Sequence, residues 1–444
     1  MMKQRLSVFG LGKLGCSMLA CFASKGWQVI GMDINKRSVD YVNNGESPIF
    51  EPGVRELISK YKNNISATSD TEYAVINSDI SFVIVPTPST KDGTFSTDFV
   101  ETVAAEIGSI LRTKDSYHTV VITSTVLPGD MELIKNLIER TSGKNCSKNF
   151  GLCYNPDFIA LGSVVRDFLN PEMVLIGESD KKTGDTLENI HRNLTDNNPK
   201  IHRMNFYNAE LTKIALNSYC TLKITFANTL AEICENIPGG NVDQVTDALG
   251  DDPRIGRKYL KGGLSYGGPC FPRDNRAFAK SAEKFGCTTP LAVKTDQIND
   301  YHRNERIPNM LLALMKEQKT KKLSILGLTY KIDTQIVEES AAISIINALL
   351  KEDIQLSVYD PAGMEESKKE ITDFDKIHFT NSAKECISGA KVCFIATPWK
   401  EFESLSKQDF LNSMSDNPTI IDGWNLYSFE NDTDFKYLQI GKES

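Results

Sequence analysis

The sequence lacks the features that mark membrane, secreted and nucleic-acid-binding proteins. Its 444 residues contain no long apolar run, and the first apolar stretch gives way to a glycine loop after a few residues. That stretch is too short for a signal peptide or a membrane span, so we expect a cytoplasmic protein. No long block of Lys or Arg occurs and the net charge is -8, which argues against nucleic acid or an anionic membrane as a partner.

Cysteine and histidine are not arranged for metal binding. The ten cysteines form no Cys-x-x-Cys pair, and the five histidines do not cluster near them. We therefore expect no metal site and no disulfide framework, with most thiols reduced and structural. The composition, 40% hydrophobic and 24% charged, is typical of a soluble globular enzyme. The chain is too long for one core of ordinary size, so we expect two or three domains.

Residues 5 to 35 carry a complete βαβ pattern for dinucleotide binding. An apolar strand, a glycine loop, a helix ending near Ser24 and a second strand follow one another. In the loop, Gly10 allows a tight turn, Gly12 allows close approach of a pyrophosphate, and Gly15 allows the helix to pack on the strand. The loop residues expected to contact the cofactor are Gly10, Gly12, Lys13, Leu14 and Gly15.

Polar residues at the ends of three strands are further candidate cofactor contacts. Asp33 ends the second strand, where its carboxylate would accept hydrogen bonds from the ribose and repel a 2′-phosphate, so NAD is favoured over NADP. Lys36 lies nearby and weakens that preference slightly. Thr87 and Thr125 follow the predicted strands 80–85 and 120–123. The alternative for Asp33, Thr87 and Thr125 is helix capping.

The stretch from Asn208 to Glu235 has apolar residues at spacings of three and four over about eight turns, which predicts one long helix. Lys213 and Asn217 are four residues apart and therefore share a face of it. Exposed, solvated side chains are one explanation for this pair. A place in the lining of a pocket is the other, because their neighbours on that face are apolar.

The last third of the chain repeats the pattern of the first. Lys322 to Tyr330 resembles the first strand and its loop, and later apolar runs end at Asp360 and Thr397 as the earlier ones end at Asp33 and Thr87. A second α/β domain is therefore predicted. Its glycine loop is degraded, so we expect it to bind something other than a dinucleotide, with Lys331 available for a phosphate.

Between these domains lies a loop that presents a single cysteine. Ser265 to Asn275 contains two glycines and two prolines, which prevent a regular helix or sheet and define a turn around Cys270. An inert, packed cysteine is the alternative to a reactive one.

Together these motifs resemble the UDP-glucose/GDP-mannose dehydrogenase family, over essentially the whole chain. The resemblance implies an α/β fold of two doubly wound, Rossmann-like domains joined by a long central helix and a helical dimerisation region. The implied domains are an NAD-binding domain at 1–200, a central helical domain with the cysteine loop at 201–300, and a nucleotide-sugar-binding domain at 301–444. The residues that carry the resemblance are Gly10 to Gly15, Ser124-Thr125, 155–158, 208–213 with Asn217, 254–256, 259–261, 267–274 and 330–334.

The resemblance implies that a C6 hydroxyl of a nucleotide sugar is oxidised to a carboxylate with two NAD. Cys270 would hold the aldehyde as a thiohemiacetal and then a thioester, which explains why a cysteine is needed. Arg273 would face the cofactor, and the implied catalytic residues are Cys270, Lys213, Asn217, Asp274, Asp157 and Thr125. A UDP-hexose would contact Lys213, Asn217, Arg254, Tyr259, Lys261, Gly267 and Lys331. Arg254 would reach a neighbouring subunit, so a homodimer is expected.

Three departures from the family pattern leave the sugar open. Asp157 replaces a glutamate, Ala160 and Leu161 replace an arginine and a glutamate, and Glu338 replaces an arginine. The lost charges would permit a bulkier substituent, such as an N-acetyl group. Two alternatives remain: a two-electron dehydrogenase of the β-hydroxyacid type, which would have no use for Cys270, and a non-catalytic nucleotide-sugar-binding protein.

Overall fold

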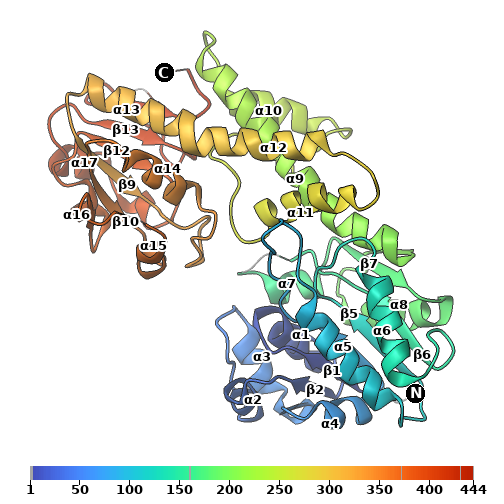
Figure 1. Ribbon diagram of the computed structural model, residues 1–444. Coiled ribbons are helices and arrows are strands. Elements are labelled where there is room, and N and C mark those ends of the chain that lie inside the picture. The colour runs from blue at the N-terminus through green and yellow to red at the C-terminus, as the bar shows by residue number, and fades with distance from the viewer. Residues whose placement is uncertain (1–3, 160–161, 372, 431, 444) are drawn as a thin grey trace. The chain divides into compact units, whose positions relative to one another are not determined.

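The computed structural model describes residues 4–159, 162–371, 373–430 and 432–443 (Figure 1). The chain divides into two compact units, Met1–Ala215 and Leu216–Ser444, and each contains its own sheet. No helix in the described ranges is long and apolar enough to cross a membrane.

The sheet of the first unit has the strand order β3-β2-β1-β4-β5-β6-β7-β8. Its neighbouring strands run parallel, except for β6 and β7. The order reverses at β1, whose neighbours are β2 and β4, and such a reversal is where open α/β sheets bind ligands. The strands are β1 Leu6–Phe9, β2 Val29–Met32, β3 Ile65–Thr68, β4 Ile80–Val83, β5 His118–Ile122, β6 Phe150–Tyr154, β7 Met173–Glu178 and β8 Lys200–Met204.

Helices cover both faces of this sheet, because successive side chains of a strand point to opposite faces. Leu6 and Val8 pack in a cluster with α1, α3 and α7, whereas Phe9 packs in another with α4, α5 and α6. The helices are α1 Lys13–Ser24, α2 Lys36–Asn43, α3 Val54–Lys60, α4 Thr71–Ile76, α5 Asp98–Leu111, α6 Asp130–Ser142, α7 Val164–Leu169 and α8 Lys181–Leu194, with a 3-10 turn at Lys62–Asn64.

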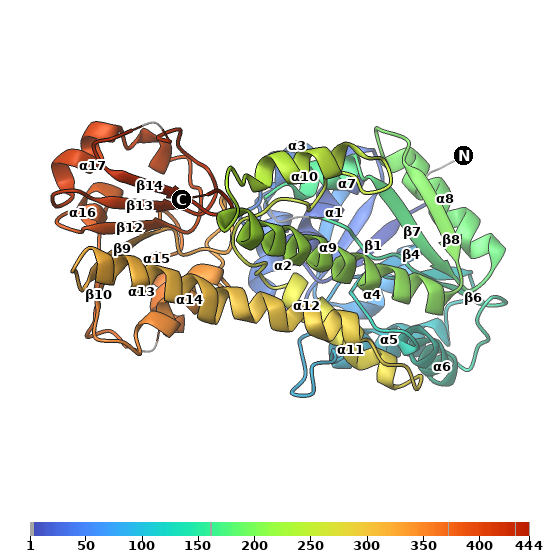
Figure 2. The same cartoon turned by 90° about the horizontal axis from the view of Figure 1, so that it is seen from above.

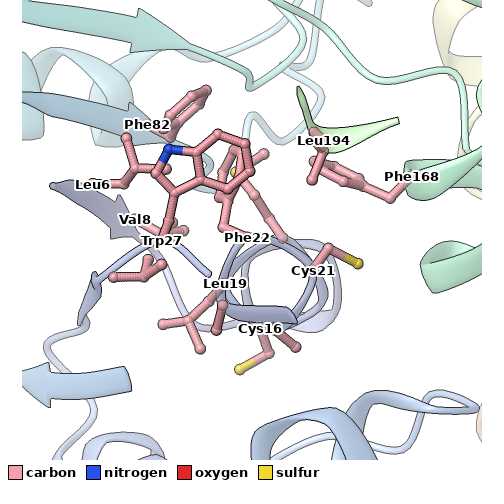
Figure 3. Packing of buried hydrophobic residues seen from close by; sticks show 14 of the residues in the cluster. Leu6, Val8, Cys16, Leu19, Cys21, Phe22, Trp27, Phe82, Phe168 and Leu194 are labelled. Carbon is pink, nitrogen blue, oxygen red and sulfur yellow. The ribbon is translucent and has the colours of Figure 1, made fainter. Parts of the chain in front are cut away.

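Helix α1 is the centre of the first core. Its residues from Gly15 to Ala23 are all buried, and Phe22 contacts Trp27, Phe82 and Phe168 at ring-centroid distances of 5.7, 4.9 and 6.1 Å (Figure 3). Burying one such ring contributes roughly 1.5–3 kcal/mol. This packing fixes the helix whose N-terminus faces the glycine loop.

The predicted long helix is present as α9, Phe206–Glu235, which begins in the first unit and continues into the second. After it come α10 Val242–Asp251, α11 Phe271–Glu283 and α12 Pro290–Tyr301. A π-helical segment, η2 His302–Arg306, joins α12 to α13 Ile307–Glu317 without a break, so these three elements form one rod (Figure 2).

The second sheet has the order β11-β10-β9-β12-β13-β14, with every pair parallel among its described strands. As in the first sheet, the strand order reverses at the strand that comes first in the chain, here β9, whose neighbours are β10 and β12. The fold prediction of two doubly wound domains and a long helix is confirmed. The strands are β9 Lys322–Leu326, β10 Gln355–Tyr359, β11 Ile377–Phe379, β12 Val392–Ile395, β13 Thr419–Asp422 and β14 Lys436–Gln439. The helices are α14 Ala341–Leu349, α15 Met364–Glu370, α16 Ala383–Ile387 and α17 Lys407–Ser413, with a 3-10 turn at Phe402–Ser404.

Several strand boundaries differ from the prediction, and β2, for one, ends at Met32, so Asp33 follows the strand. The strand expected at 80–85 ends at Val83, and the strand expected at 120–123 is β5, which begins at His118 and ends at Ile122. Both strands stop where Ser124 exchanges hydrogen bonds with the backbone of Val85, so side-chain bonds replace the ladder there.

Candidate active site

The glycine loop leaves open space in front of α1. Gly10 has φ +99°, and a Cβ on it would lie 2.3 Å from the carbonyl oxygen of Ile84; a Cβ on Gly15 would lie 1.8 Å from the carbonyl oxygen of Gly10. A Cβ on Gly12 would meet no atom within 4 Å, and no side chain caps α1 there. Together with Lys13 and Leu14 in the first helical turn, these backbone N–H groups fit the pyrophosphate of a dinucleotide.

The carboxylate of Asp33 is held in one orientation beside this loop. Its Oδ2 accepts a hydrogen bond from the backbone N–H of Leu11 at 2.6 Å, and its Oδ1 accepts one from Asn35 at 2.7 Å. Each oxygen keeps acceptor capacity for a ribose hydroxyl. Asp33 does not cap α2, because Asn35 does so. Lys36 is exposed at the start of α2.

Thr87 and Thr125 follow two neighbouring strands, β4 and β5. Thr87 is buried and Thr125 is half-buried. Ser124 ties these strand ends together, because its Oγ donates to the carbonyl oxygen of Val85 at 2.7 Å. The capping alternative for the two threonines is wrong, since the helices that follow them, α5 and α6, are preceded by Thr97 and Gly129.

Asp157 and Lys213 meet within the first unit. The Nζ of Lys213 donates to the backbone carbonyl of Asp157 at 2.5 Å and lies 4.7 Å from the ring centroid of Phe158. The Oδ2 of Asp157 is buried and accepts no hydrogen bond from the described residues. Burial raises the pKa of Asp157 to about 7, with Lys213 acting in the opposite direction. This carboxyl group therefore titrates near neutral pH, as a general acid or base requires.

Two buried side chains that the sequence did not single out hold the segment around Asp157. His191 bonds through Nε2 to Oδ1 of Asn155 at 2.7 Å, and Glu51 accepts hydrogen bonds from the backbone of Gly162 at 2.8 Å and Val164 at 3.1 Å. Glu51 lies more than a hundred residues from these partners, so no local pattern could have linked them. Ala160 and Leu161, where the sequence departs from the family, lie outside the described residues.

Cys270 stands at the N-terminus of α11 with its side chain exposed. All ten cysteines lie in the described part of the chain as thiols, and seven are buried residues of strands and helices, unlike Cys270. A helix N-terminus stabilises a thiolate at that position. Burial raises the pKa of Tyr330 to about 12, and the nearby Cys270 contributes a smaller part of this increase. The phenol therefore stays neutral beside the thiol.

Asn217 and Asp274 are brought together within the second unit. The amide Nδ2 of Asn217 on α9 donates to Oδ2 of Asp274 on α11 at 2.6 Å, and Asp274 is 1% exposed. Arg273 donates from Nε to the other carboxylate oxygen at 3.0 Å. Asp274 follows Cys270 by one helical turn, and Lys213 precedes Asn217 by one turn of α9.

Three of the four predicted substrate contacts between α10 and α11 are on the surface. Arg254 pairs with Asp252, Nη2 to Oδ2 at 2.5 Å, and is largely exposed. Tyr259 has a left-handed backbone with φ +62°, and its ring lies 5.6 Å from that of Phe271. Lys261 lines a cavity of about 440 Å³.

The loop after β9 places Lys331 in the second α/β domain. Gly327 there has φ +93°, as Gly10 has φ +99° in the first. Lys331 is half-buried, with its Nζ 5.7 Å from the ring centroid of Tyr330. The side chain of Glu338, the third departure, is exposed.

The doubly wound first domain, with its open glycine loop and Asp33 after β2, is that of an NAD-dependent dehydrogenase, and a second α/β domain follows it in the chain. Family models of the UDP-glucose/GDP-mannose dehydrogenases match along the chain: the NAD binding domain at residues 4–195, the central domain at 207–301 and the UDP binding domain at 324–429. The chain belongs to this family, and it is an NAD-dependent nucleotide-sugar dehydrogenase.

Individual relatives match this chain over most of their lengths. UDP-glucose 6-dehydrogenase AglM of Haloferax volcanii is 33% identical over 98% of this chain and 99% of that protein. GDP-mannose 6-dehydrogenase of Pseudomonas aeruginosa is 35% identical over 80% of this chain and 81% of that protein. The solved structure of a UDP-glucose dehydrogenase from Pyrobaculum islandicum has a TM-score of 0.85 at 28% identity, covering 99% of this chain and 98% of that one. Family membership decides against the β-hydroxyacid and non-catalytic alternatives.

Proposed function

We propose that the protein oxidises the C6 hydroxyl of a UDP-hexose to a carboxylate in two successive hydride transfers, with Cys270 as the covalent nucleophile. The observation that carries the proposal is the geometry around α11, which presents Cys270 at its N-terminus and holds Asp274 against Asn217 one turn later. A two-electron dehydrogenase needs an acid or base but no thiol, whereas an aldehyde must be held before its second oxidation.

The first oxidation requires a base and a site for a developing oxyanion. NAD, bound on Asp33 and the glycine loop, supplies the hydride acceptor for both oxidations. Asp274, acting through a water molecule, takes the proton of the C6 hydroxyl as the C–H bond breaks. Asn217 and Lys213 stabilise the oxygen by hydrogen bonding.

In the second oxidation the Cys270 thiolate adds to the aldehyde carbon, forming a C–S bond and a thiohemiacetal. Loss of hydride from that carbon gives a thioester, and water then breaks the C–S bond to release the carboxylate and the thiol. Asp157, whose pKa is about 7, takes the proton of the attacking water. Each sugar consumes one water, reduces two NAD and releases three protons.

Counting NADH per nucleotide sugar consumed tests this proposal. A ratio of two NADH per sugar supports it, whereas a ratio of one, or no NADH formed, overturns the four-electron reaction. The assay should use a panel of UDP- and GDP-hexoses with and without a 2-acetamido group, since the charges lost at Ala160 and Leu161 favour a bulky or less polar sugar. We expect UDP-sugars to be preferred over GDP-sugars, because residues 324–429 match the family's UDP binding domain.

We also propose that the active unit is a homodimer joined through α9. Tyr219, Phe226 and Ile233, seven residues apart, are 59%, 50% and 50% exposed and form an apolar row in the second unit. Such a row at a spacing of seven is typical of a helix that packs on a second helix. Light scattering should find a dimer that Phe226→Asp weakens, whereas Asn236→Asp, which adds the same charge on an exposed polar site, should not.

Arg254 is expected to complete the site of the neighbouring subunit. Mixing Arg254→Ala with Cys270→Ala chains should then restore about a quarter of wild-type activity, because half of randomly exchanged dimers are mixed and each has one complete site. Absence of any restored activity, with exchange demonstrated, would place Arg254 in its own subunit's site.

A further inference from the structure

The loop that carries Cys270 rests on the backbone of residues 338–340. The N–H of Gly268 donates to the carbonyl oxygen of Glu338 at 3.1 Å. A Cβ on Gly267 would lie 2.2 Å from the carbonyl oxygen of Glu339, and one on Gly268 would lie 2.5 Å from the ring of Tyr330. Gly268 also has φ +82°. The two glycines therefore allow a backbone-to-backbone contact that no side chain could share.

The segment under the loop is held by the carboxylate of Glu339. Its Oε1 accepts a hydrogen bond from Nη1 of Arg276 at 2.6 Å, and its Oε2 accepts one from Nη1 of Arg303 at 2.7 Å. Burial disfavours the charged form, but the two guanidinium groups prevail and hold the pKa of Glu339 below its usual value. Glu339 has φ +52°, an unfavourable conformation for a residue with a Cβ. A strained backbone persists only where its surroundings hold it.

The Glu339–Arg276 ion pair also involves α11, the helix that follows the loop. Arg276 lies on α11, the helix that begins at Cys270, and its Nε donates to Asp296 on α12 at 2.9 Å. Tyr266, at the start of the loop, donates to Asp296 through its hydroxyl at 3.1 Å and to Asn299 through its backbone N–H at 2.9 Å. Glu339 is therefore the carboxylate that connects the support of the loop to the helix that follows it.

We propose that Glu339 is a positioning residue for Cys270: by bridging Arg276 and Arg303 it fixes residues 338–340, against which the cysteine loop is held for the second oxidation. The inference rests on the proposed function of Cys270. The first oxidation depends on Asp274 and Asn217, and Asp274 has its own hydrogen bonds to Asn217 and Arg273, which do not involve Glu339. Loss of the bridge therefore affects capture of the aldehyde more than its formation.

The test compares Glu339→Gln with Glu283→Gln, the same substitution in an exposed ion pair with Lys280 on α11. Three quantities are measured: NADH formed per sugar consumed, aldehyde trapped by phenylhydrazine, and the rate of Cys270 alkylation by iodoacetamide, followed by peptide mass spectrometry. In Glu339→Gln we expect the NADH ratio to fall from two towards one, trapped aldehyde to rise, and the alkylation rate to change by at least ~3-fold, because small displacements of a nucleophile cost rate. Glu283→Gln should match the wild type.

The outcomes separate the inference from the proposed function. If the wild type gives one NADH per sugar, the proposed function fails, and the role of Glu339 is then judged by alkylation alone. A Glu339→Gln protein with a ratio of two and an alkylation rate within ~2-fold of wild type overturns the inference. If Glu339→Gln does not fold, Arg303→Lys, which keeps the charge but loses the planar fork, should shift the same three quantities in the same direction.

Discussion

Replacing Asp157 by Asn should change the pH dependence of stability in a direction that few carboxylates show. The Oδ2 of Asp157 is buried and accepts no hydrogen bond from the described residues, and burial raises its pKa from 3.8 to about 7. The folded protein therefore retains a proton that the unfolded chain has lost between about pH 4 and pH 7, so this group lowers stability as the pH rises through that window. Each pH unit corresponds to about 1.4 kcal/mol.

Between pH 5 and pH 8 the ionisation of Asp157 should cost the wild type about 3 kcal/mol, because about two pH units of this window lie below its pKa. The amide introduced by Asp157→Asn does not titrate, so the free energy of unfolding of this variant relative to wild type should rise by that amount over the same range. Urea unfolding of both proteins at pH 5, 6, 7 and 8 measures the difference.

A second aspartate, Asp92, provides the control for this measurement. Hydrogen bonds from Thr90 and Thr94 lower the pKa of the exposed Asp92 to about 2, so it is ionised throughout the range. The effect of Asp92→Asn should therefore be independent of pH. If the effect of Asp157→Asn is equally constant from pH 5 to pH 8, then Lys213 outweighs burial, Asp157 is ionised throughout, and its role as a base that titrates near neutrality must be abandoned.

Three further perturbations test the rest of the site. Cys270→Ser should keep nucleotide-sugar binding but lose at least ~10³-fold in turnover, because an alkoxide is far harder to form than a thiolate, and mass spectrometry should detect an accumulating adduct; near wild-type turnover would make Cys270 a packing residue. Wild type should prefer NAD over NADP by at least ~10-fold in kcat/KM, and Asp33→Asn should narrow the gap; equal values for wild type would contradict the assignment of Asp33. Glu51→Gln should lower kcat more than it raises KM, since it leaves the backbone of Gly162 and Val164 with a weaker acceptor; unchanged kinetics would limit Glu51 to a structural role.

The sequence predicted the local geometry of the candidate site, where each motif is short. The glycine loop, the pair on α9 and the Cys270 loop are each contained in a short motif, because one turn of backbone defines their geometry. The supports of these motifs join distant positions. Glu51 bonds to Gly162, and Glu339 bonds to Arg276, so no spacing rule could have paired them before the fold was known.

The repeat of the two α/β domains was also predicted from the sequence, but the contacts of its second aspartate were not. Asp360 directly follows β10 as Asp33 directly follows β2, and the sequence predicted this correspondence. The carboxylate of Asp360, however, is 1% exposed and accepts hydrogen bonds from the backbone of Leu328 at 2.7 Å and from the indole of Trp399 at 3.1 Å.

Because its own domain occupies that carboxylate, the second sheet has no acid to offer a ribose at this described position, whereas Asp33 retains acceptor capacity on both oxygens. The expectation that the second domain binds something other than a dinucleotide thus gains a physical reason beyond its degraded glycine loop. Trp399→Phe tests this. The substitution removes the indole N–H donor but keeps an aromatic ring, so thermal stability should fall by a few degrees, while NAD binding measured by calorimetry should stay at one molecule per chain. A second NAD bound per chain in this variant would show that Asp360 had been withheld from a dinucleotide site only by its partners.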